Sequence, residues 1–380
     1  RRMCFKHWCF CTSVLKLHFL WCNIQFGLIL ICWHSGNAYL CRMKSATTRP
    51  DIGRQSNIEL LRIVSMMMVL AVHIDGASLG LPESVTSSRD VWRLVVEALA
   101  IVGVNCFTMI SGYFGIKLSL KNVISFIFQC VFYSVGIYTA FGIAFPSHFS
   151  WSGWLESWMV LTHTDLWYVP AYFCLMIISP MLNAGMDALT KRMFTIVLCL
   201  FTAVNIWGGW WWGGSFNPTG YTVIQLVWVY MIARYLRIYC MIEPNKRKRT
   251  ALWALASYAV SVFGIAVCAV NMPTLKAYAY NAPLVITATV ALFAFFLCLD
   301  IRSHTVNYIA KSAFAVYLLH KAPIVWGNAM KPAVVYLWES LPLAAFTFAA
   351  IGLMAGIYVL AMAIDALRRM ISDKIFSYRV

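Results

Sequence analysis

Charged residues are scarce in this chain of 380 residues. They make up only 12% of it, whereas soluble domains carry about 25%. Hydrophobic residues make up 61%, and the mean hydropathy is +0.73. Because a surface of this composition is not compatible with water, the scarcity of charge excludes a soluble enzyme, a disordered tail and a secreted disulfide scaffold. It predicts an all-α fold, a polytopic bundle of transmembrane helices.

Acidic residues are rare too, and two well-known catalytic motifs are missing. The chain has 14 acidic residues against 30 basic ones, a formal net charge of +16. The patterns GxxxxGK(S/T) and HExxH do not occur, so the sequence gives no sign of a P-loop or a zinc-protease helix. We therefore expect no metal. Repeats, low-complexity tracts and long linkers are also missing, which indicates one membrane domain.

Apolar segments account for most of the remaining sequence. A membrane span needs about 20 apolar residues. We count ten candidates, of which the fourth, fifth and ninth are short: Ile58–Leu79, Val91–Phe114, Val123–Phe145, Leu166–Leu182, Met193–Trp207, Tyr221–Tyr239, Ala251–Val270, Ala282–Leu299, Ser312–Gly327 and Leu341–Ile364.

The distribution of basic residues supports this count, because cytoplasmic loops of membrane proteins are enriched in Lys and Arg. With the Met43 end placed in the cytoplasm, 20 of the 25 basic residues from there onward lie on the cytoplasmic side. The bias predicts ten spans with both ends in the cytoplasm, and it explains the net charge without a nucleic-acid partner. The exceptions are Arg89, Arg93, Lys276 and Lys331, on the outer side, and Lys321, within a span.

The first part of the chain differs in composition from the rest. Residues 1–50 contain seven basic residues, no acidic residue and six of the 13 cysteines. We expect an extension that the working protein does not need. One alternative is an additional anchor helix over roughly Leu15–Trp33. Another is a metal site at Cys4, His7, Cys9 and Cys11, although no second ligand pair follows at a zinc-like spacing.

The expected organisation has four parts: a dispensable extension at 1–42, a cytoplasmic lead at 43–57, the membrane domain at 58–370 and a cytoplasmic tail at 371–380.

The first span contains ionisable residues, which are costly in a bilayer and therefore indicate function. Arg62 and His73 are eleven residues apart, so they lie on one stripe of a helix, about 16 Å apart. Glu59 can pair with Arg62 on the same face, whereas Asp75 points to nearly the opposite side. We predict Arg62 and His73 as catalytic residues. The alternatives are a snorkelling interface arginine and a hydrogen-bonded packing histidine.

Two other spans carry polar groups at a similar depth. Glu97 of the second span lies about as far below the outer membrane surface as His73, so we expect it to orient or charge-balance this histidine. The alternative is a carboxyl group that faces a water-filled mouth. The ninth span contributes Tyr317, His320 and Lys321. Three polar groups in one short span indicate an aqueous cavity rather than a lipid face.

The outer loops are rich in tryptophan. One contains Trp151, Trp154 and Trp158, and the other reads WGGWWWGGSFNP from Trp207 to Pro218. Tryptophan is common at membrane interfaces, so an interfacial belt is one interpretation. A platform on which sugar rings stack is the other.

Four short motifs resemble those of the acyltransferase-3 family, in the order in which that family has them. The family marker in the first span is an arginine, ten further residues and a histidine, which Arg62 and His73 match. The motifs, spread over roughly residues 54–330, are Arg54-Gln-Ser-Asn-Ile-Glu59-Leu-Leu-Arg62 running to His73, Phe107-Thr-Met-Ile-Ser111-Gly112-Tyr113-Phe114, Leu166-Trp167-Tyr168 through Ser179-Pro180, and Tyr317-Leu-Leu-His320.

This resemblance implies a membrane enzyme that transfers an acyl group, often acetyl, from acyl-CoA to a sugar of a cell-surface glycan. It implies Glu59, Arg62, Ser111, Tyr113, Lys117 and Lys121 as donor-binding residues. It implies Trp167, Tyr168, Asp165, Tyr317 and His320 as acceptor-binding residues. Three positions depart from the family pattern: Lys117 and Lys121 stand where many members have arginines, and Asp165 where many have histidine.

On this basis His73 is the expected general base, which takes the proton of an acceptor hydroxyl; a covalent acyl-histidine relay is the variant. The expected location is the inner membrane of a bacterial cell, with the bilayer and a glycan or lipid-linked sugar as partners. The main alternative is an exporter of a glycan or lipid-linked sugar, which would need no CoA site. A membrane sensor is a third class, although the sequence shows no appended soluble domain.

Overall fold

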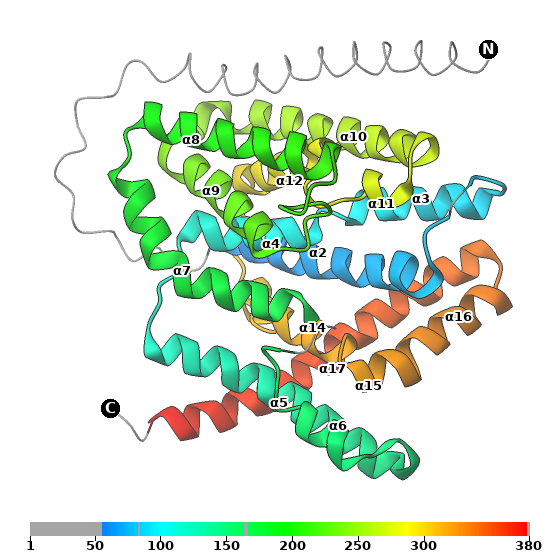
Figure 1. Cartoon of the computed structure of the whole chain (residues 1–380). Helices are drawn as coiled ribbons and strands as arrows, with labels where there is room; N and C mark the ends of the chain where they lie inside the picture. Colours follow the sequence, from blue (N-terminus) through cyan, green and yellow to red (C-terminus); the bar gives the residue numbers. More distant parts are fainter. Residues whose placement is uncertain (1–54, 83, 163–165, 378–380) are drawn as a thin grey trace. The chain divides into compact units, whose positions relative to one another are not determined.

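The structure is a computed structural model that describes residues 55–82, 84–162 and 166–377, with side chains as far as residue 374. The predictions for residues 1–42, for most of the cytoplasmic lead and for Asp165 lie outside the described residues. Throughout the described ranges the regular structure is helical (Figure 1). The predicted all-α fold class is therefore confirmed.

Sixteen labelled helices follow one another in this part of the chain: α2 (Ser56–Val72), α3 (Ser88–Ala100), α4 (Gly103–Phe114), α5 (Leu120–Ala144), α6 (Trp151–Glu156), α7 (Tyr168–Ala188), α8 (Lys191–Ala203), α9 (Val223–Tyr239), α10 (Arg247–Asn271), α11 (Thr274–Ala277), α12 (Pro283–Cys298), α13 (His304–Ala310), α14 (Ala313–His320), α15 (Pro323–Val325), α16 (Lys331–Ser340) and α17 (Leu343–Ser377). Three π-helical segments, His73–Ala77, Val204–Trp211 and Trp326–Met330, follow α2, α8 and α15.

Seven of the described helical segments are long and apolar enough to cross a membrane, by length and composition. They correspond to the predicted first to fifth, seventh and tenth spans. The predicted sixth and eighth spans coincide with α9 and α12, which have only 17 and 16 residues. The predicted ninth span is not one continuous helix, because α14 ends at His320 and α15 begins at Pro323. The ten-span count and the cytoplasmic side of both ends stay predictions.

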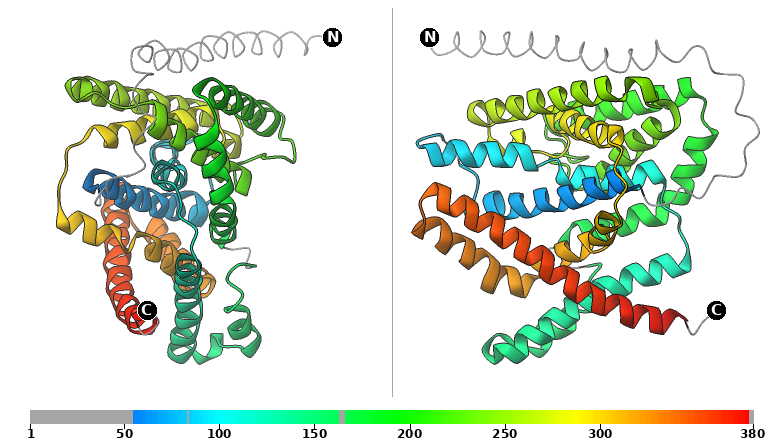
Figure 2. Two further views of the ribbon diagram at one scale, coloured as in Figure 1. Left: turned by 90° about the vertical axis from the view of Figure 1, so that its left-hand side faces the viewer. Right: turned by 180° about the vertical axis from the view of Figure 1, so that it is seen from behind.

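Helix α2 lies at the centre of the bundle. It packs against α3, α4, α12, α13, α14 and α17, and Figures 1 and 2 show it between α4 on one side and α14 and α17 on the other. The side chains of Ile58, Leu61 and Leu70 on α2 are fully buried. Because this central helix carries Arg62 and His73 follows it directly, neighbouring helices enclose both residues.

Helices α4 and α9 cross at Gly112. A Cβ atom on this residue would stand 2.5 Å from the carbonyl oxygen of Tyr230 and 2.8 Å from its Cα. Backbone atoms cannot move aside as a flexible side chain can, so the crossing requires glycine. Gly112 belongs to the sequence motif that precedes the loop at Lys117, and the close crossing fixes where this loop begins.

We expect Gly112→Ala to lower the free energy of unfolding by about 1–3 kcal/mol, the usual cost of overpacking. Gly136→Ala in α5 is the matched control, since a Cβ there meets nothing within 4 Å. Thermal unfolding of both variants in detergent measures the effect. Equal melting temperatures for the two variants would show that the α4–α9 crossing is looser than described.

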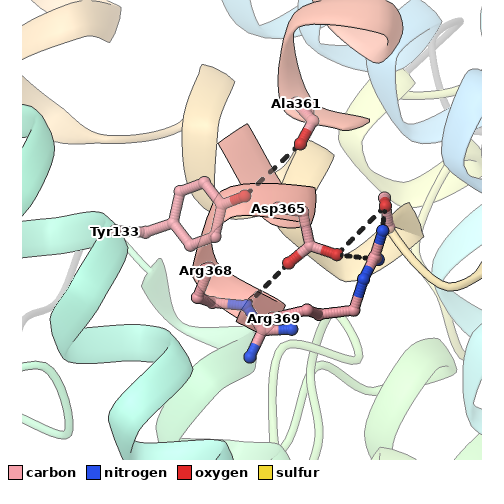
Figure 3. A network of polar contacts seen from close by, with 6 residues as sticks. Tyr133, Ala361, Asp365, Arg368 and Arg369 are labelled. Carbon is pink, nitrogen blue, oxygen red and sulfur yellow. Dashed lines mark hydrogen bonds and ion pairs between the residues drawn. The ribbon is translucent and has the colours of Figure 1, made fainter. Parts of the chain in front are cut away.

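A buried ionic network joins α14 to α17 (Figure 3). Asp365 has no exposed surface and pairs with both Arg368 and Arg369 of its own helix. The hydroxyl group of Ser312, the residue before α14, donates to Oδ2 of Asp365 at 3.0 Å. Tyr133 of α5 donates to the carbonyl oxygen of Ala361 nearby. The network therefore fixes the position of α14 along α17.

A second buried network consists of side-chain amides. The carbonyl oxygen of Tyr280 accepts hydrogen bonds from Asn105 at 2.9 Å and from Gln225 at 3.0 Å. Because buried polar groups are costly unless they are paired, these contacts hold the segment before α12 in one position. The network comprises Asn105, Asn205, Asn217, Gln225 and Asn281, all fully buried.

Candidate functional site

Arg62 lies near the start of α2, where it pairs with Glu59 as predicted. Its Nε atom is 3.1 Å from Oε2 of Glu59, one helical turn away. The side chain of Arg62 keeps 30% of its surface exposed, and it lines a cavity. The carboxylate thus orients the guanidinium group, whose other N–H groups remain available to an anion.

The cavity that Arg62 lines has a volume of about 380 Å³, and we name it the donor cavity. It brings together Arg62, Ser111 and Lys117, three of the residues predicted to bind a donor. Such a combination of two cations and a hydroxyl group suits phosphate groups. The full lining is Arg62, Ile110, Ser111, Phe114, Gly115, Ile116, Lys117, Asn122, Ser125, Phe126, Gln129, Tyr172 and Met176.

The three other predicted donor residues, Glu59, Tyr113 and Lys121, do not line this cavity. Glu59 pairs with Arg62 instead. The hydroxyl group of Tyr113 accepts a hydrogen bond from Arg237 at 3.1 Å, and its ring lies 4.9 Å below the same guanidinium group. Tyr113 therefore packs toward α9 and not toward Ser111. Lys121 lies at the exposed start of α5, outside the lining.

The polar lining from α5 was not predicted. Asn122, Ser125 and Gln129 are spaced by three and four residues, and such a spacing places them on one face of a helix. A polar stripe on an otherwise apolar span is a signal that the sequence contains. It could have identified α5 as a wall of the donor cavity.

The loop beside Lys117 is held by both backbone groups of Ile116. The amide group of Ile116 donates to the Tyr230 hydroxyl at 2.8 Å, and its carbonyl oxygen accepts from the side-chain amide of Asn183 at 3.0 Å. Tyr230 in turn donates to Asn183 at 2.8 Å. Gly115 has a φ of +76°, which glycine adopts without strain. This clamp fixes the edge of the donor cavity.

His73 lies at a second, smaller cavity of about 40 Å³. Trp167, Tyr168 and Tyr317, all predicted to bind the acceptor, line it together with His73. We name it the histidine cavity. His73 is the first residue of the π-helical segment after α2. Such a local deviation from the α-helix is frequent at functional sites. The remaining lining residues are Met66, Val69, Val104, Phe107, Tyr280 and Phe314.

The partner of His73 is His320, whereas the sequence predicted Glu97. Nδ1 of His73 lies 2.8 Å from Nε2 of His320. The carboxylate oxygens of Glu97 lie at Gly76 instead, 3.1 and 3.2 Å from where a Cβ of this glycine would stand. Glu97 and His73 were paired because they lie at a similar depth in the membrane, but depth does not determine the direction in which a side chain points.

His320 itself was expected to contact the acceptor. It is 1% exposed and is not part of the lining of the histidine cavity. The structure therefore places it behind His73. Asp75 was predicted not to be the partner of His73, and it pairs with Arg93, with 2.6 Å between Oδ1 and Nε.

Aromatic rings connect the two cavities. Tyr172, at the donor cavity, stacks on Tyr168, at the histidine cavity, with 5.6 Å between ring centroids. Phe126 and Phe314 form a second such pair at 5.6 Å. The Ser111 hydroxyl lies 3.2 Å from that of Tyr172. Aromatic rings thus lie between the cationic cavity and the histidine cavity, and residues of α2 line both cavities.

The outer tryptophan residues have mixed surroundings. Trp207 and Trp212 are 59% and 69% exposed, whereas Trp210 is buried and donates to the carbonyl oxygen of Lys276. Trp151 is also exposed. Interfacial belt and sugar platform both fit these exposures, so both interpretations stay open.

Metal ligands do not gather in the described part of the chain: no group of three His, Cys, Asp or Glu side chains is arranged to hold an ion. A protein-family model described as an acyltransferase domain matches residues 55–362, which include both cavities. The chain belongs to the acyltransferase-3 family. No curated protein and no solved structure matches it. Membership of this family and the seven long apolar helices together indicate that the chain is a multi-pass membrane acyltransferase.

Proposed function

We propose that this family member is an O-acyltransferase that transfers an acyl group, in the first instance acetyl, from cytoplasmic acyl-CoA to a hydroxyl group of a surface or exported glycan. The observation that carries the proposal is the pair of cavities on α2. One contains Arg62 and Lys117, the other contains His73, and aromatic rings join them. Acyl-CoA fits this arrangement of two cavities, because it has a charged nucleotide at one end and a long, thin pantetheine arm that carries the acyl group.

The donor would approach from the cytoplasmic side. Its nucleotide is too highly charged to enter the bilayer, so Arg62 and Lys117 would bind its phosphates at the membrane surface. Arg62 and His73, eleven residues apart, are separated by about 16 Å along the helical axis. The extended pantetheine arm would cover this distance past Ser111 and Tyr172.

At the histidine cavity the acceptor hydroxyl would attack the thioester carbonyl carbon while His73 takes its proton. An ester bond forms, the carbon–sulfur bond breaks, and His73 returns the proton to the departing thiolate, so the enzyme is regenerated. A volume of about 40 Å³ holds only about three water molecules. This small size favours a short acyl group such as acetyl.

The acceptor ring would remain outside this small cavity, against Trp167 and Tyr168. Both rings line the cavity, and aromatic faces are suited to stack on sugars. The enzyme would operate in the bacterial inner membrane, with donor and acceptor on opposite sides. A covalent acyl-histidine intermediate is the variant of this mechanism.

Release of free CoA thiol tests the proposal. Purified full-length protein with acetyl-CoA should release thiol only when a glycan with free hydroxyl groups is added. Thiol release without acceptor would indicate the acyl-histidine variant. Glycan transport across vesicles without any thiol release would instead support an exporter, which needs no donor cavity.

The clamp on Ile116 yields a prediction about donor binding. Asn183→Ala removes the hydrogen bond to the Ile116 carbonyl oxygen, which frees the loop of Lys117. We expect KM for acetyl-CoA to rise by about 5- to 10-fold, because one such hydrogen bond contributes about 1 kcal/mol, while kcat is retained. Steady-state kinetics measure both constants.

Asn328→Ala is the matched control, since the Asn328 side chain is exposed and bonds only within its own turn. An unchanged KM in Asn183→Ala would show that the Lys117 loop does not contact the donor.

A further inference from the structure

His320 is held between a backbone carbonyl group and His73. Its Nδ1 atom lies 2.6 Å from the carbonyl oxygen of Val316, and its Nε2 atom lies 2.8 Å from Nδ1 of His73. Both of its ring nitrogens are therefore in contact with protein atoms. A residue that is 1% exposed and occupied on both sides has no ring nitrogen left for a substrate.

The carbonyl group determines where the hydrogen atoms lie. A carbonyl oxygen only accepts, so Nδ1 of His320 carries a hydrogen and donates it to Val316. A neutral imidazole has a single N–H group, so Nε2 of His320 has a lone pair. The contact of His320 with His73 then requires a hydrogen from Nδ1 of His73. The other nitrogen of His73, Nε2, keeps its lone pair.

The surroundings of both rings favour the neutral imidazole. The ammonium group of Lys321 lies close enough to act electrostatically on both imidazoles. In the described part of the chain, neither ring forms an ion pair with a carboxylate. An additional buried positive charge without a partner would be costly.

We propose that His320 is a positioning residue that holds His73 in the tautomer whose Nε2 atom is the base. The inference rests on the proposed function, because it specifies how the same histidine acts. As His73 takes the acceptor proton on Nε2, its Nδ1–H group stays donated to His320. The proton on Nε2 then passes to the departing thiolate. A hydrogen-bond partner commonly selects the reactive nitrogen of a histidine in this manner.

The fold holds this partner in register. Helix α14 begins directly after Ser312, whose side chain is bound by Asp365 and Arg369 of α17. His320 is the last residue of α14. Because the start of α14 is held by α17, the length of α14 determines the position at which His320 contacts His73.

The tautomer can be measured without any turnover. Full-length protein with ¹⁵N-labelled histidine is examined in bilayers by solid-state NMR, and the His73 signals are those missing from His73→Ala. We expect a protonated Nδ1 and an unprotonated Nε2 on His73. A protonated Nε2 in the resting protein would overturn the proposal, whether or not acyl transfer is detected.

Two variants then test the consequence for catalysis. His320→Leu removes the acceptor, and we expect kcat to fall by about 10- to 100-fold, as for other groups that orient a reactive histidine. KM for acetyl-CoA should stay unchanged. His320→Gln offers an amide oxygen to Nδ1–H and should retain most of kcat.

Equal losses in both variants, or full activity in His320→Leu, would overturn the positioning role. If wild-type protein transfers nothing while its His73 tautomer is as expected, the proposed function fails and the hydrogen-bond assignment stands.

Discussion

Replacing His73 with alanine should lower kcat for acyl transfer by about 10²- to 10⁴-fold, which is the usual contribution of a positioned general base. The structure supports this expectation because His73 lines a cavity with Trp167 and Tyr168, and His320 already occupies its Nδ1. The affinity for acetyl-CoA should remain at the wild-type value, since the donor cavity does not include His73. Transfer kinetics and donor binding are measured on the same membranes.

His148→Ala is the control for this variant, because His148 is exposed and lies far along the chain from α2. It should behave as wild type. Wild-type kcat in His73→Ala would contradict the general-base role. A combined loss of kcat and of donor affinity would show that His73 contributes to donor binding.

Replacing Arg62 should weaken donor binding. A charge-assisted hydrogen bond contributes about 1.5–3 kcal/mol, so we expect Arg62→Leu to raise Kd for acetyl-CoA by about 10- to 100-fold. The loss should shrink at high salt, where exposed charges are screened. Arg62→Lys should recover part of the affinity, since it keeps the charge but not the planar donor group.

Removal of Arg62 leaves Glu59 without its partner, and an unpaired buried carboxylate can destabilise the fold. The double variant Arg62→Leu with Glu59→Gln avoids this problem and should show the same loss of affinity. Arg302→Leu is the control, because Arg302 is 94% exposed. Unchanged donor affinity in the double variant would exclude Arg62 from the donor site.

The sequence predicted the features that depend on spacing along one helix. Glu59 and Arg62 pair, and Arg62 on α2 and His73 directly after it line different cavities, which is compatible with the predicted separation of about 16 Å along the helix. Asp75 was correctly separated from His73. Such relations follow from helical geometry alone, so no tertiary information is needed.

The features that depend on contact between helices were harder to predict. Glu97 was paired with His73 by depth, but depth does not specify the direction of a side chain around its helix. His320 is distant in sequence from His73, so helical spacing does not bring the two residues together. The break between His320 and Pro323 was likewise hidden within an apolar segment.

Isotope transfer from the donor distinguishes acyl transfer to glycan from glycan export. Membranes with the full-length chain receive CoA that is labelled in its acetyl group or, separately, in its nucleotide, and surface glycan is then isolated. We expect wild type to transfer the acetyl label and not the nucleotide label, and His73→Ala to transfer neither. Glycan that reaches the outer surface in a chain-dependent manner without any acetyl label would contradict an acyltransferase acting on this acceptor.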